Sequence, residues 1–456
     1  VGLFKMTKQG FGTVVPEGSD DAVSISPRYR GMAVHGDTVE VSLFAQSSVR
    51  TEKGQPREGE VVQIVKRGRV DLVGTLERSR NFYIVIPDDR KIARDIFVDK
   101  DHLNKATPGE KVVVQIESWG VGHLNPEGRV VEVLGKAGEV SAELKSVIRE
   151  FKLPLHFPAE VMSEAELLPA SIPASELSRR LDLRDELCFT IDPEDAKDFD
   201  DAVSLTDLHG GDYRLGVHIA DVSSYVKEGG EIDREALKRG TSVYFPNMVV
   251  PMIPERLSNI LCSLRPDEDR LTFSVLMTVT PKGIVKDYEI KETVIRSKRR
   301  FSYEEVESLL DESIDRASDQ HADGETLRML HAMQTMSAVL TKKRLKEGSI
   351  DFETAEAKFH FDEEGNPTEI RKKPRLRSHR LVEEFMLLAN QVVAQHIGVA
   401  KKEDHRRPFL YRIHDSPDPD RIRELAAFIE QFGYKLRIDA GVPSKDLQKL
   451  LEQVRG

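Results

Sequence analysis

The sequence has very few cysteines and no long apolar run. Its 456 residues include two cysteines, Cys188 and Cys262, too few for a disulfide framework or a four-cysteine zinc site. We therefore expect two buried thiols in a reducing compartment, with the cytoplasm as the location. No stretch approaches the roughly 18–20 apolar residues of a membrane-spanning helix, and the first residues lack a signal-peptide pattern. We expect no membrane partner.

The sequence also has no excess of positive charge. Lys and Arg total 67, Asp and Glu total 78, and the formal net charge is −11. This excludes a uniformly basic nucleic-acid-binding surface, so any contact with a polyanion must use local basic patches. The length suggests about three domains. Because the chain starts with Val1 in a strand-like pattern and stops at Gly456 after a helical one, we expect both ends to be truncated.

The N-terminal part alternates apolar and polar residues with a period of two, broken by Gly, Pro and Asp. This pattern is typical of short antiparallel strands in a small barrel. The alternation occurs twice, and the polar residues 46–59 lie between the two occurrences. The second occurrence starts with the apolar stretch 61–65. The pattern predicts two tandem β-barrels, over residues 1–50 and 55–135.

From about residue 136 helical and strand patterns are mixed, which predicts one large α+β domain over 136–456, unfinished at its C-terminus. The helices are expected over 141–151, 175–183, 302–310, 327–345, 380–400 and 420–432. The strands are expected over 213–225, 271–280 and 284–296, with a hairpin of 356–361 and 368–372.

The strongest chemical signal is a run of acidic residues. Residues 192–201 contain five Asp and one Glu, directly after an apolar stretch. Packing such like charges together is unfavourable unless a cation neutralises them, and hard oxygen ligands select Mg²⁺, Mn²⁺ or Ca²⁺. In an extended chain Asp198 and Asp200 share a side, whereas Asp201 needs a turn to join them. Two divalent ions held by carboxylates would suit hydrolysis of a phosphodiester.

Two other interpretations of the acidic run remain open from the residues alone: an exposed acidic loop and a helix N-terminus. A calcium-binding EF-hand loop fits poorly, because a start at Asp192 puts Lys197 where glycine is needed. A start at Asp198 puts Val203 at that position.

Aromatic residues of the two predicted barrels form a second signal. Small barrels bind single-stranded nucleic acids by stacking bases on aromatic rings beside basic side chains. The candidates are Phe11, Phe82, Tyr83 and Phe97, with Lys66, Arg67, Arg69, Arg78 and Arg80 close by in the sequence. The alternative is that the Phe side chains belong to the barrel cores.

A basic run and a histidine complete the candidates. Six of the ten residues 371–380 are Lys or Arg and none is acidic, so this run is either a solvated loop or a track for phosphates. His218 lies in an apolar stretch, where a core histidine is more usual than a metal ligand.

Together these features resemble the ribonuclease II and ribonuclease R (RNB) family, and its ribonuclease R branch more closely. The resemblance covers nearly the whole chain and is strongest in these segments: residues 190–205, 215–226, 242–254 with 257–264, 350–361, 379–390 and 410–415. Residues 10–16 and 35–37 resemble the first cold-shock-like barrel of that family. The resemblance implies an α+β multidomain fold: two tandem cold-shock-like OB barrels followed by an RNB catalytic domain.

The resemblance also implies a function. The family members are 3′→5′ hydrolytic exoribonucleases that use Mg²⁺, act on single-stranded 3′ ends of RNA and release 5′-mononucleotides; we expect a monomer. The catalytic, metal-binding aspartates match Asp192, Asp198, Asp200 and Asp201. The substrate-binding positions match Tyr244 and Phe352, which would contact the terminal bases, and Glu384, which would lie near the terminal ribose.

The sequence departs from the family pattern in one respect. The family's His-Phe-Thr-Ser-Pro-Ile-Arg-Arg-Tyr segment, whose arginine contacts the scissile phosphate, does not occur here. An S1-type barrel and an N-terminal helical extension are not found either. The alternative expectation is therefore an RNA-binding fragment without turnover. A structural or regulatory Ca²⁺ protein is a third possibility that the poor EF-hand match disfavours.

Overall fold

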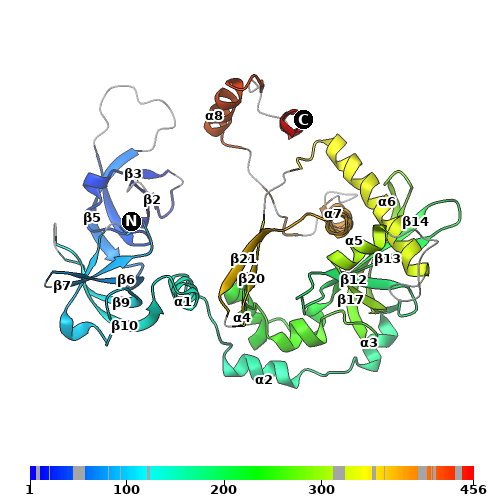
Figure 1. Cartoon of the computed structure of the whole chain (residues 1–456), viewed down its shortest axis with the longest axis horizontal. Helices are drawn as coiled ribbons and strands as arrows, with labels where there is room; N and C mark the ends of the chain where they lie inside the picture. Colours follow the sequence, from blue (N-terminus) through cyan, green and yellow to red (C-terminus); the bar gives the residue numbers. More distant parts are fainter. Residues whose placement is uncertain are drawn as a thin grey trace. The chain divides into compact units, whose positions relative to one another are not determined.

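The structure, a computed structural model, describes residues 1–6, 11–19, 21–44, 57–80, 82–92, 94–120, 124–311, 324–351, 356–363, 365–398, 408–411, 413, 417–436 and 444–455. The chain divides into two compact units (Figure 1). The first is formed mainly by Val1–Leu155, and the second by His156–Phe361 with Pro367–Gly456. No helix in the described residues is long and apolar enough to cross a membrane.

The first barrel is closed by five strands in the order β1-β2-β3-β5-β4. These strands are β1 (Gly2–Met6), β2 (Gly12–Pro16), β3 (Val23–Ile25), β4 (Thr38–Leu43) and β5 (Arg57–Lys66). Alternate residues point inwards, so Phe4, Val14 and Ile25 are fully buried.

The stretch 61–65 does not begin the second barrel as the sequence pattern suggests. It belongs to β5, which pairs with β3 in parallel and with β4 antiparallel. Strands β1 to β4 alone would leave two unpaired edges, and β5 removes both.

The second barrel is also closed, in the order β10-β8-β7-β6-β9. Its strands are β6 (Asp71–Ser79), β7 (Phe82–Pro87), β8 (Ile96–Val98), β9 (Glu110–Ser118) and β10 (Glu127–Lys136). Helix α1 (Val140–Glu150) follows and packs against β6, β9 and β10, so it lies in the first compact unit. Two closed five-stranded barrels confirm the tandem-barrel prediction.

The second unit is built on a seven-stranded mixed sheet in the order β11-β18-β17-β14-β13-β12-β19. Its strands are β11 (Leu181–Asp182), β12 (Cys188–Asp192), β13 (Asp201–Asp207), β14 (Tyr213–Ala220), β17 (Asp269–Val279), β18 (Val285–Arg296) and β19 (Arg299–Ser302). Two short hairpins stand apart from it: β15 (Val243–Tyr244) with β16 (Val249–Val250), and β20 (Ala357–Phe361) with β21 (Pro367–Lys372).

Helices cover both faces of this sheet (Figure 1). One face packs its apolar side chains against α5 (Tyr303–Asp311), α6 (Gly324–Glu347) and α7 (Arg377–Gly398). The other face packs against α2 (Ala159–Leu167), α4 (Glu231–Arg239) and the short π-helix η4 (Arg256–Leu261). The remaining helices are α3 (Ala174–Arg179), α8 (Pro419–Glu430) and α9 (Ser444–Arg455). Helices α2 and α4 were not predicted from the sequence.

The second face of the sheet contains a chain of buried polar side chains across four strands. His218 forms hydrogen bonds through both ring nitrogens, with Ser204 Oγ at 3.0 Å and with Ser274 Oγ at 2.7 Å. The chain continues from Ser274 Oγ to Thr293 Oγ1 at 2.5 Å and on to Thr272 Oγ1 at 2.6 Å. His218 is fully buried, as expected for a core histidine. Because a one-residue slip would leave these groups unpaired, the chain favours a single strand register.

This burial makes stability depend on pH. Desolvation lowers the pKa of His218 to about 4, from an ordinary value of 6.5. Between these two values the unfolded chain binds more protons than the folded one, so the free energy of unfolding falls as the pH is lowered from 6.5 to 4. The predicted loss is about 3 kcal/mol. Urea unfolding followed by circular dichroism should show this fall in the free energy of unfolding between pH 6.5 and 4 in the wild type. In His218→Gln the fall should be absent. The exposed His209→Gln is the control; an unchanged slope in His218→Gln would contradict the prediction.

Candidate active site

The four predicted aspartates lie at the ends of two neighbouring strands of the second unit's sheet and in the loop that joins them. Asp192 is the last residue of β12 and Asp201 the first of the antiparallel neighbour β13, so the loop between them contains Asp198 and Asp200. Neighbouring strand ends therefore bring together residues that are nine positions apart. Asp192 is buried, whereas Asp198 and Asp200 have solvent-accessible side chains.

These carboxylates raise the pKa values of one another. Burial, and then the charges of Asp200 and Asp198, raise the pKa of Asp192 to about 6. Burial, and then the charges of Asp200 and Asp192, raise the pKa of Asp201 to about 7. The pKa of Asp200 is raised by burial and by Asp198. Each negative charge therefore disfavours ionisation of its neighbours, and a cation would remove this penalty.

The donor set fits a hard divalent cation. Asp192 Oδ2 is buried and has no hydrogen-bond partner, which is unusual for a buried carboxylate oxygen. All candidate donors are carboxylate oxygens, the ligands that Mg²⁺ and Mn²⁺ prefer. In the part of the chain that the structure describes, no three His, Cys, Asp or Glu side chains converge closely enough to hold an ion. The fit therefore rests on the chemistry and burial of the donors.

Two side chains from other elements hold the acidic loop. Arg300 of β19 donates through Nη2 to the carbonyls of Pro193 and Glu194, the latter at 2.7 Å. Ser263 is buried, and its hydroxyl donates to the Lys197 carbonyl at 2.9 Å and accepts from the Phe199 amide at 3.1 Å. The loop that positions Asp198 and Asp200 is thus fixed at both ends.

A tyrosine that the sequence analysis missed faces the cluster. Tyr303 begins α5, directly after Ser302, which pairs with Asp192 in the parallel β19–β12 ladder. Its pKa is raised by burial and then by the charges of Asp201, Asp192 and Asp200. Its ring stacks on His379 of α7, with 3.9 Å between the centroids. Only the pairing of β19 with β12 reveals this proximity, since 111 residues separate Asp192 from Tyr303 in the sequence.

The three predicted substrate-binding residues have different positions. Tyr244, in β15, is 68% exposed, and its pKa is raised by partial burial and then by Asp198 and Asp200, which places its hydroxyl near the cluster. Phe352 lies outside the described residues. Glu384 is buried in α7, where its carboxylate accepts hydrogen bonds from Arg344 Nη2 at 2.6 Å and Thr341 Oγ1 at 3.0 Å. Its partners are thus on α6, and a contact with ribose stays a prediction.

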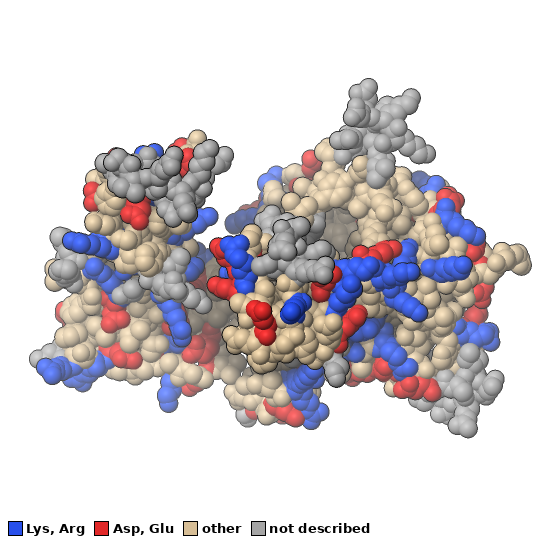
Figure 2. Space-filling model, turned by 90° about the horizontal axis from the view of Figure 1, so that it is seen from above, with Lys and Arg blue, Asp and Glu red and all other residues tan. Residues whose placement is uncertain are grey.

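The basic run 371–380 is largely neutralised by ion pairs. Arg375 and Arg380 both pair with Asp351, at 2.7 and 3.2 Å, and Arg377 pairs with Glu307 at 2.7 Å. On the face drawn in Figure 2, basic and acidic side chains are interspersed in both units. These observations do not favour a phosphate track along this run.

The barrel aromatics are partly available to a ligand. Phe11 and Phe82 are 50% and 42% exposed, which excludes the core interpretation for both. Phe82 and Phe97 lie with their ring centroids 6.0 Å apart, and the Arg78 guanidinium lies 6.0 Å from the ring of Tyr83. This arrangement suits stacking of bases beside a cation.

Comparison with known proteins identifies the class first. Residues 180–456 match the RNB domain, residues 2–64 the ribonuclease B OB domain, and residues 84–158 the cold shock domain. The OB match includes most of β5, in agreement with the first barrel, and the cold shock match includes α1. The fold is thus two OB-type barrels followed by a mixed α+β RNB domain, and the chain belongs to the RNB-domain ribonuclease family.

The curated relatives are ribonucleases R. Ribonuclease R of Thermotoga maritima is 39% identical over the full chain, and that of Escherichia coli is 36% identical over 98% of it. The chain spans 62% and 53% of the lengths of these relatives. The ribonuclease R resemblance predicted from the sequence is confirmed.

Solved structures agree in fold. The Mycoplasma genitalium RNase R, solved with ribose-methylated single-stranded RNA, has a TM-score of 0.85 at 26% identity and covers all of this chain, which in turn covers 70% of it. Yeast Ssd1, described as a pseudonuclease, has a TM-score of 0.70 at 20% identity, with 98% of this chain and 60% of Ssd1 covered. A protein described as a pseudonuclease can therefore share the fold, and a function must be argued from the site.

Proposed function

We propose that the chain contains the active site of a 3′→5′ hydrolytic exoribonuclease that degrades single-stranded RNA to 5′-mononucleotides with Mg²⁺. The observation that supports this most is the cluster of Asp192, Asp198, Asp200 and Asp201 in an RNB domain, where burial and neighbouring negative charges raise the pKa of Asp192 and of Asp201. RNA as the partner is supported by the RNA-bound Mycoplasma relative. We also propose that it acts as a monomer in the cytoplasm.

The residues would have three roles: binding metal, holding the acidic loop and contacting RNA. Asp192 and Asp201 would be the principal metal ligands, and Asp198 and Asp200 would complete the site. Mg²⁺, in a two-ion arrangement, would supply a hydroxide at neutral pH and neutralise charge on the attacking and leaving oxygens. Arg300 and Ser263 hold the loop, so that Asp198 and Asp200 do not have to be ordered during each turnover. Tyr244 would contact the terminal nucleotide, and the effect of Asp198 on its pKa supports this role.

Digestion of a 5′-labelled single-stranded RNA tests this proposal. With Mg²⁺ we expect a ladder of products shortened from the 3′ end, and with EDTA we expect none, because the repelling carboxylates then lack their cation. A 3′-labelled RNA should release labelled 5′-mononucleotide from the first turnover. A single internal cut, or a ladder that persists in EDTA, would contradict the proposal.

The second candidate is an RNA-binding chain without turnover. The exposed Phe82 beside Phe97 and the Arg78–Tyr83 contact favour binding by the second barrel independently of the acidic cluster. This candidate predicts RNA affinity that falls with salt, but no product with Mg²⁺. The same digestion, combined with a binding titration, separates the two candidates.

A further inference from the structure

Three buried polar atoms at the acidic cluster have no hydrogen-bond partner in the part of the chain that the structure describes: Thr190 Oγ1, Asp192 Oδ2 and Arg300 Nε. They belong to the neighbouring strands β12 and β19. Among the described residues one further atom has this status, Gln334 Oε1 of α6. Native proteins rarely leave buried polar atoms unpaired, so three of them on two adjacent strands need an explanation.

The strand register brings these three side chains to one place. Thr190 and Asp192 alternate with Ile191 along β12, so their side chains point to the same face of the sheet. Thr190 pairs with Arg300 in the parallel ladder of β12 and β19, whose strands are about 4.8 Å apart. Thr190 and Asp192 are 0% and 6% exposed, so solvent does not supply the missing partners.

The electrostatics agree with this arrangement. Burial raises the pKa of Asp192 to about 6, whereas the Thr190 side chain and the positive charge of Arg300 act to lower it. Both groups therefore lie close enough to favour the carboxylate, although neither is aligned for a hydrogen bond with Oδ2. Arg300 uses Nη2 for the carbonyls of Pro193 and Glu194, and its buried Nε is left without an acceptor.

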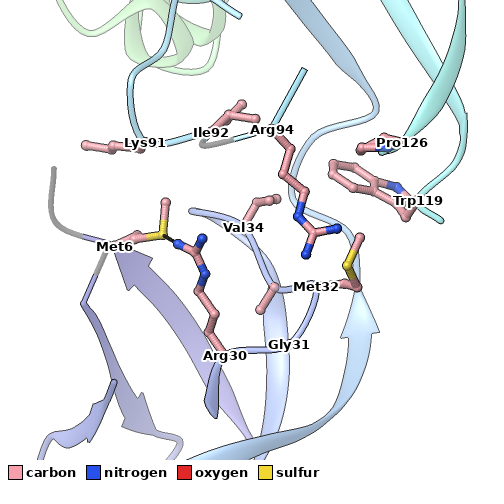
Figure 3. A pocket seen from close by; sticks show the side chains of 11 residues that line it. Met6, Arg30, Gly31, Met32, Val34, Lys91, Ile92, Arg94, Trp119 and Pro126 are labelled. Atoms are coloured by element: carbon pink, nitrogen blue, oxygen red, sulfur yellow. Dashed lines mark hydrogen bonds between the residues drawn. The ribbon is translucent and has the colours of Figure 1, made fainter. Parts of the chain in front are cut away.

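Two arginines of the first unit provide a comparison. In the pocket between the two barrels that Figure 3 shows, Arg30 Nη1 donates to the Met6 sulfur at 2.8 Å. Arg94 lines the same pocket and donates through Nη1 to the Leu124 carbonyl at 2.9 Å. Neither has a buried nitrogen without a partner. The unpaired donor of Arg300 is therefore a feature of the acidic cluster and does not extend to these arginines.

We propose that Thr190 is a positioning residue for Asp192: the Thr190 hydroxyl and Arg300 Nε donate to Oδ2, and Oδ1 binds the metal ion. A carboxylate oxygen has two lone pairs and can accept both donors. An ion that fixes Oδ1 also fixes the rotation of the carboxylate, so the two hydrogen bonds add to the affinity for the ion. The inference rests on the proposed function, because it assigns Asp192 to a metal.

Binding of Mn²⁺ to the full chain without RNA tests this inference. Mn²⁺ takes the same carboxylate ligands as Mg²⁺, and free Mn²⁺ is measured directly by electron paramagnetic resonance. The Mn²⁺ that Asp192→Asn fails to bind defines the site. Thr190→Val keeps the shape of the side chain and should weaken this binding by about tenfold, the usual loss when a group that orients a metal ligand is removed. Thr190→Ser keeps the hydroxyl and should bind as the wild type does.

A matched control and the melting temperature separate positioning from a structural role. Thr206→Val makes the same change at an exposed position of β13 and should leave Mn²⁺ binding unchanged. In EDTA, Thr190→Val should melt no lower than the wild type, because an apolar group replaces a hydroxyl that has no partner. Its melting temperature should then rise less on addition of Mn²⁺. A purely structural role predicts a lower melting temperature in EDTA and an unchanged affinity for Mn²⁺.

The outcomes distinguish this inference from the proposed function. If Thr190→Val binds Mn²⁺ as tightly as the wild type does, the positioning role is overturned and the nuclease proposal stands. If Thr190→Val binds Mn²⁺ more weakly but the wild type does not degrade RNA with Mg²⁺, the positioning role stands and the nuclease proposal fails. A wild type that binds no Mn²⁺ at this site overturns both.

Discussion

Replacement of Asp200 by Asn is expected to lower the rate of Mg²⁺-dependent RNA degradation by about a hundred- to a thousandfold, the usual effect of removing one electrostatic contributor to the transition state. Asp200 has an accessible side chain, yet its pKa is raised by burial and by Asp198, so it lies where solvent and the other carboxylates meet. The Asn side chain keeps the shape and removes the negative charge. Initial rates on a 5′-labelled RNA at saturating Mg²⁺ measure the loss.

A neighbouring aspartate provides the matched control. Asp195 lies in the same loop and is exposed, and the family resemblance gives it no role. Asp195→Asn removes the same charge and should retain the wild-type rate within about twofold, because surface substitutions away from a site have small effects. Equal losses in both variants would mean that the net charge of the loop matters and that the assignment of Asp200 is wrong.

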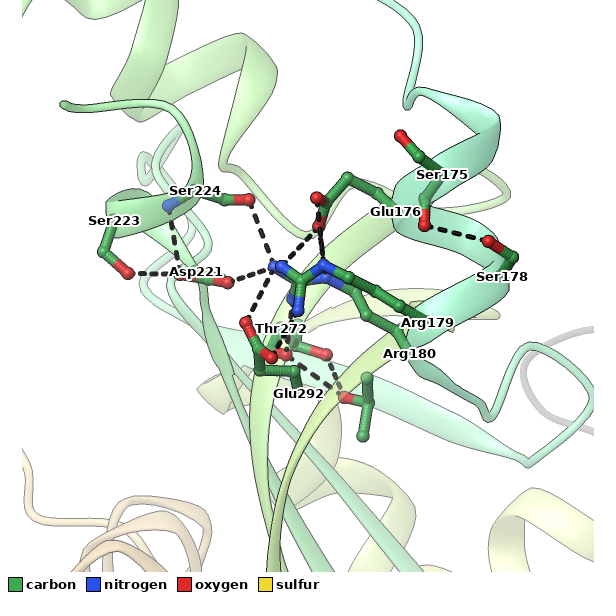
Figure 4. Close-up of polar contacts among 11 residues, drawn as sticks. Ser175, Glu176, Ser178, Arg179, Arg180, Asp221, Ser223, Ser224, Thr272 and Glu292 are labelled. Atoms are coloured by element: carbon green, nitrogen blue, oxygen red, sulfur yellow. Dashed lines mark hydrogen bonds and ion pairs between the residues drawn. The ribbon is translucent and has the colours of Figure 1, made fainter.

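The second large effect is expected on stability, at Arg180. Its side chain has no exposed surface and donates to Asp221 Oδ2 at 2.6 Å, to Glu176 Oε2 at 2.9 Å and to Ser224 Oγ at 3.1 Å (Figure 4). Asp221 is itself buried. Arg180→Met would leave this carboxylate without its cation, which costs about 3–5 kcal/mol. Urea unfolding followed by circular dichroism measures the loss; Trp119 fluorescence does not serve, because Trp119 lies in the first unit.

Arg179 is the matched control for this prediction. It precedes Arg180 and pairs with Glu176 and Glu292, but its side chain is 44% exposed. Solvent screens such pairs, so Arg179→Met should cause a much smaller loss. The double variant Arg180→Met/Asp221→Asn should recover part of the stability, because the unpaired charge is gone. If Arg180→Met loses no more stability than Arg179→Met, the buried network does not stabilise the fold.

Much of the architecture could be predicted from local patterns. Period-two alternation identified the barrel strands, and periodic apolar positions identified α6, α7 and α8, because these signals depend on residues close in sequence. The assignment of β5 failed for the opposite reason. The same alternation suits a last strand of the first barrel and a first strand of the second, and only its pairing with β3 and β4 decides between them.

In the candidate site too, local sequence patterns revealed some residues and only the fold revealed others. The acidic run was visible in the sequence because its members lie within ten residues. Tyr303, Arg300 and Ser263 were not, since β19 and the turn after η4 reach the loop only through the sheet order and the packing of the second unit. Glu384 was chosen by its position in a motif, and the structure pairs it with Arg344.

The sequence by itself determined the class of this protein: two small barrels, an α+β domain and a carboxylate cluster whose spacing resembles one ribonuclease family. Only the tertiary structure decided which charges are compensated. Asp221 and Glu384 have cationic partners, Arg180 and Arg344, whereas the acidic cluster keeps like charges together. The reason is physical: the free energy of a charge depends on its burial and on neighbours that the fold brings from distant parts of the chain.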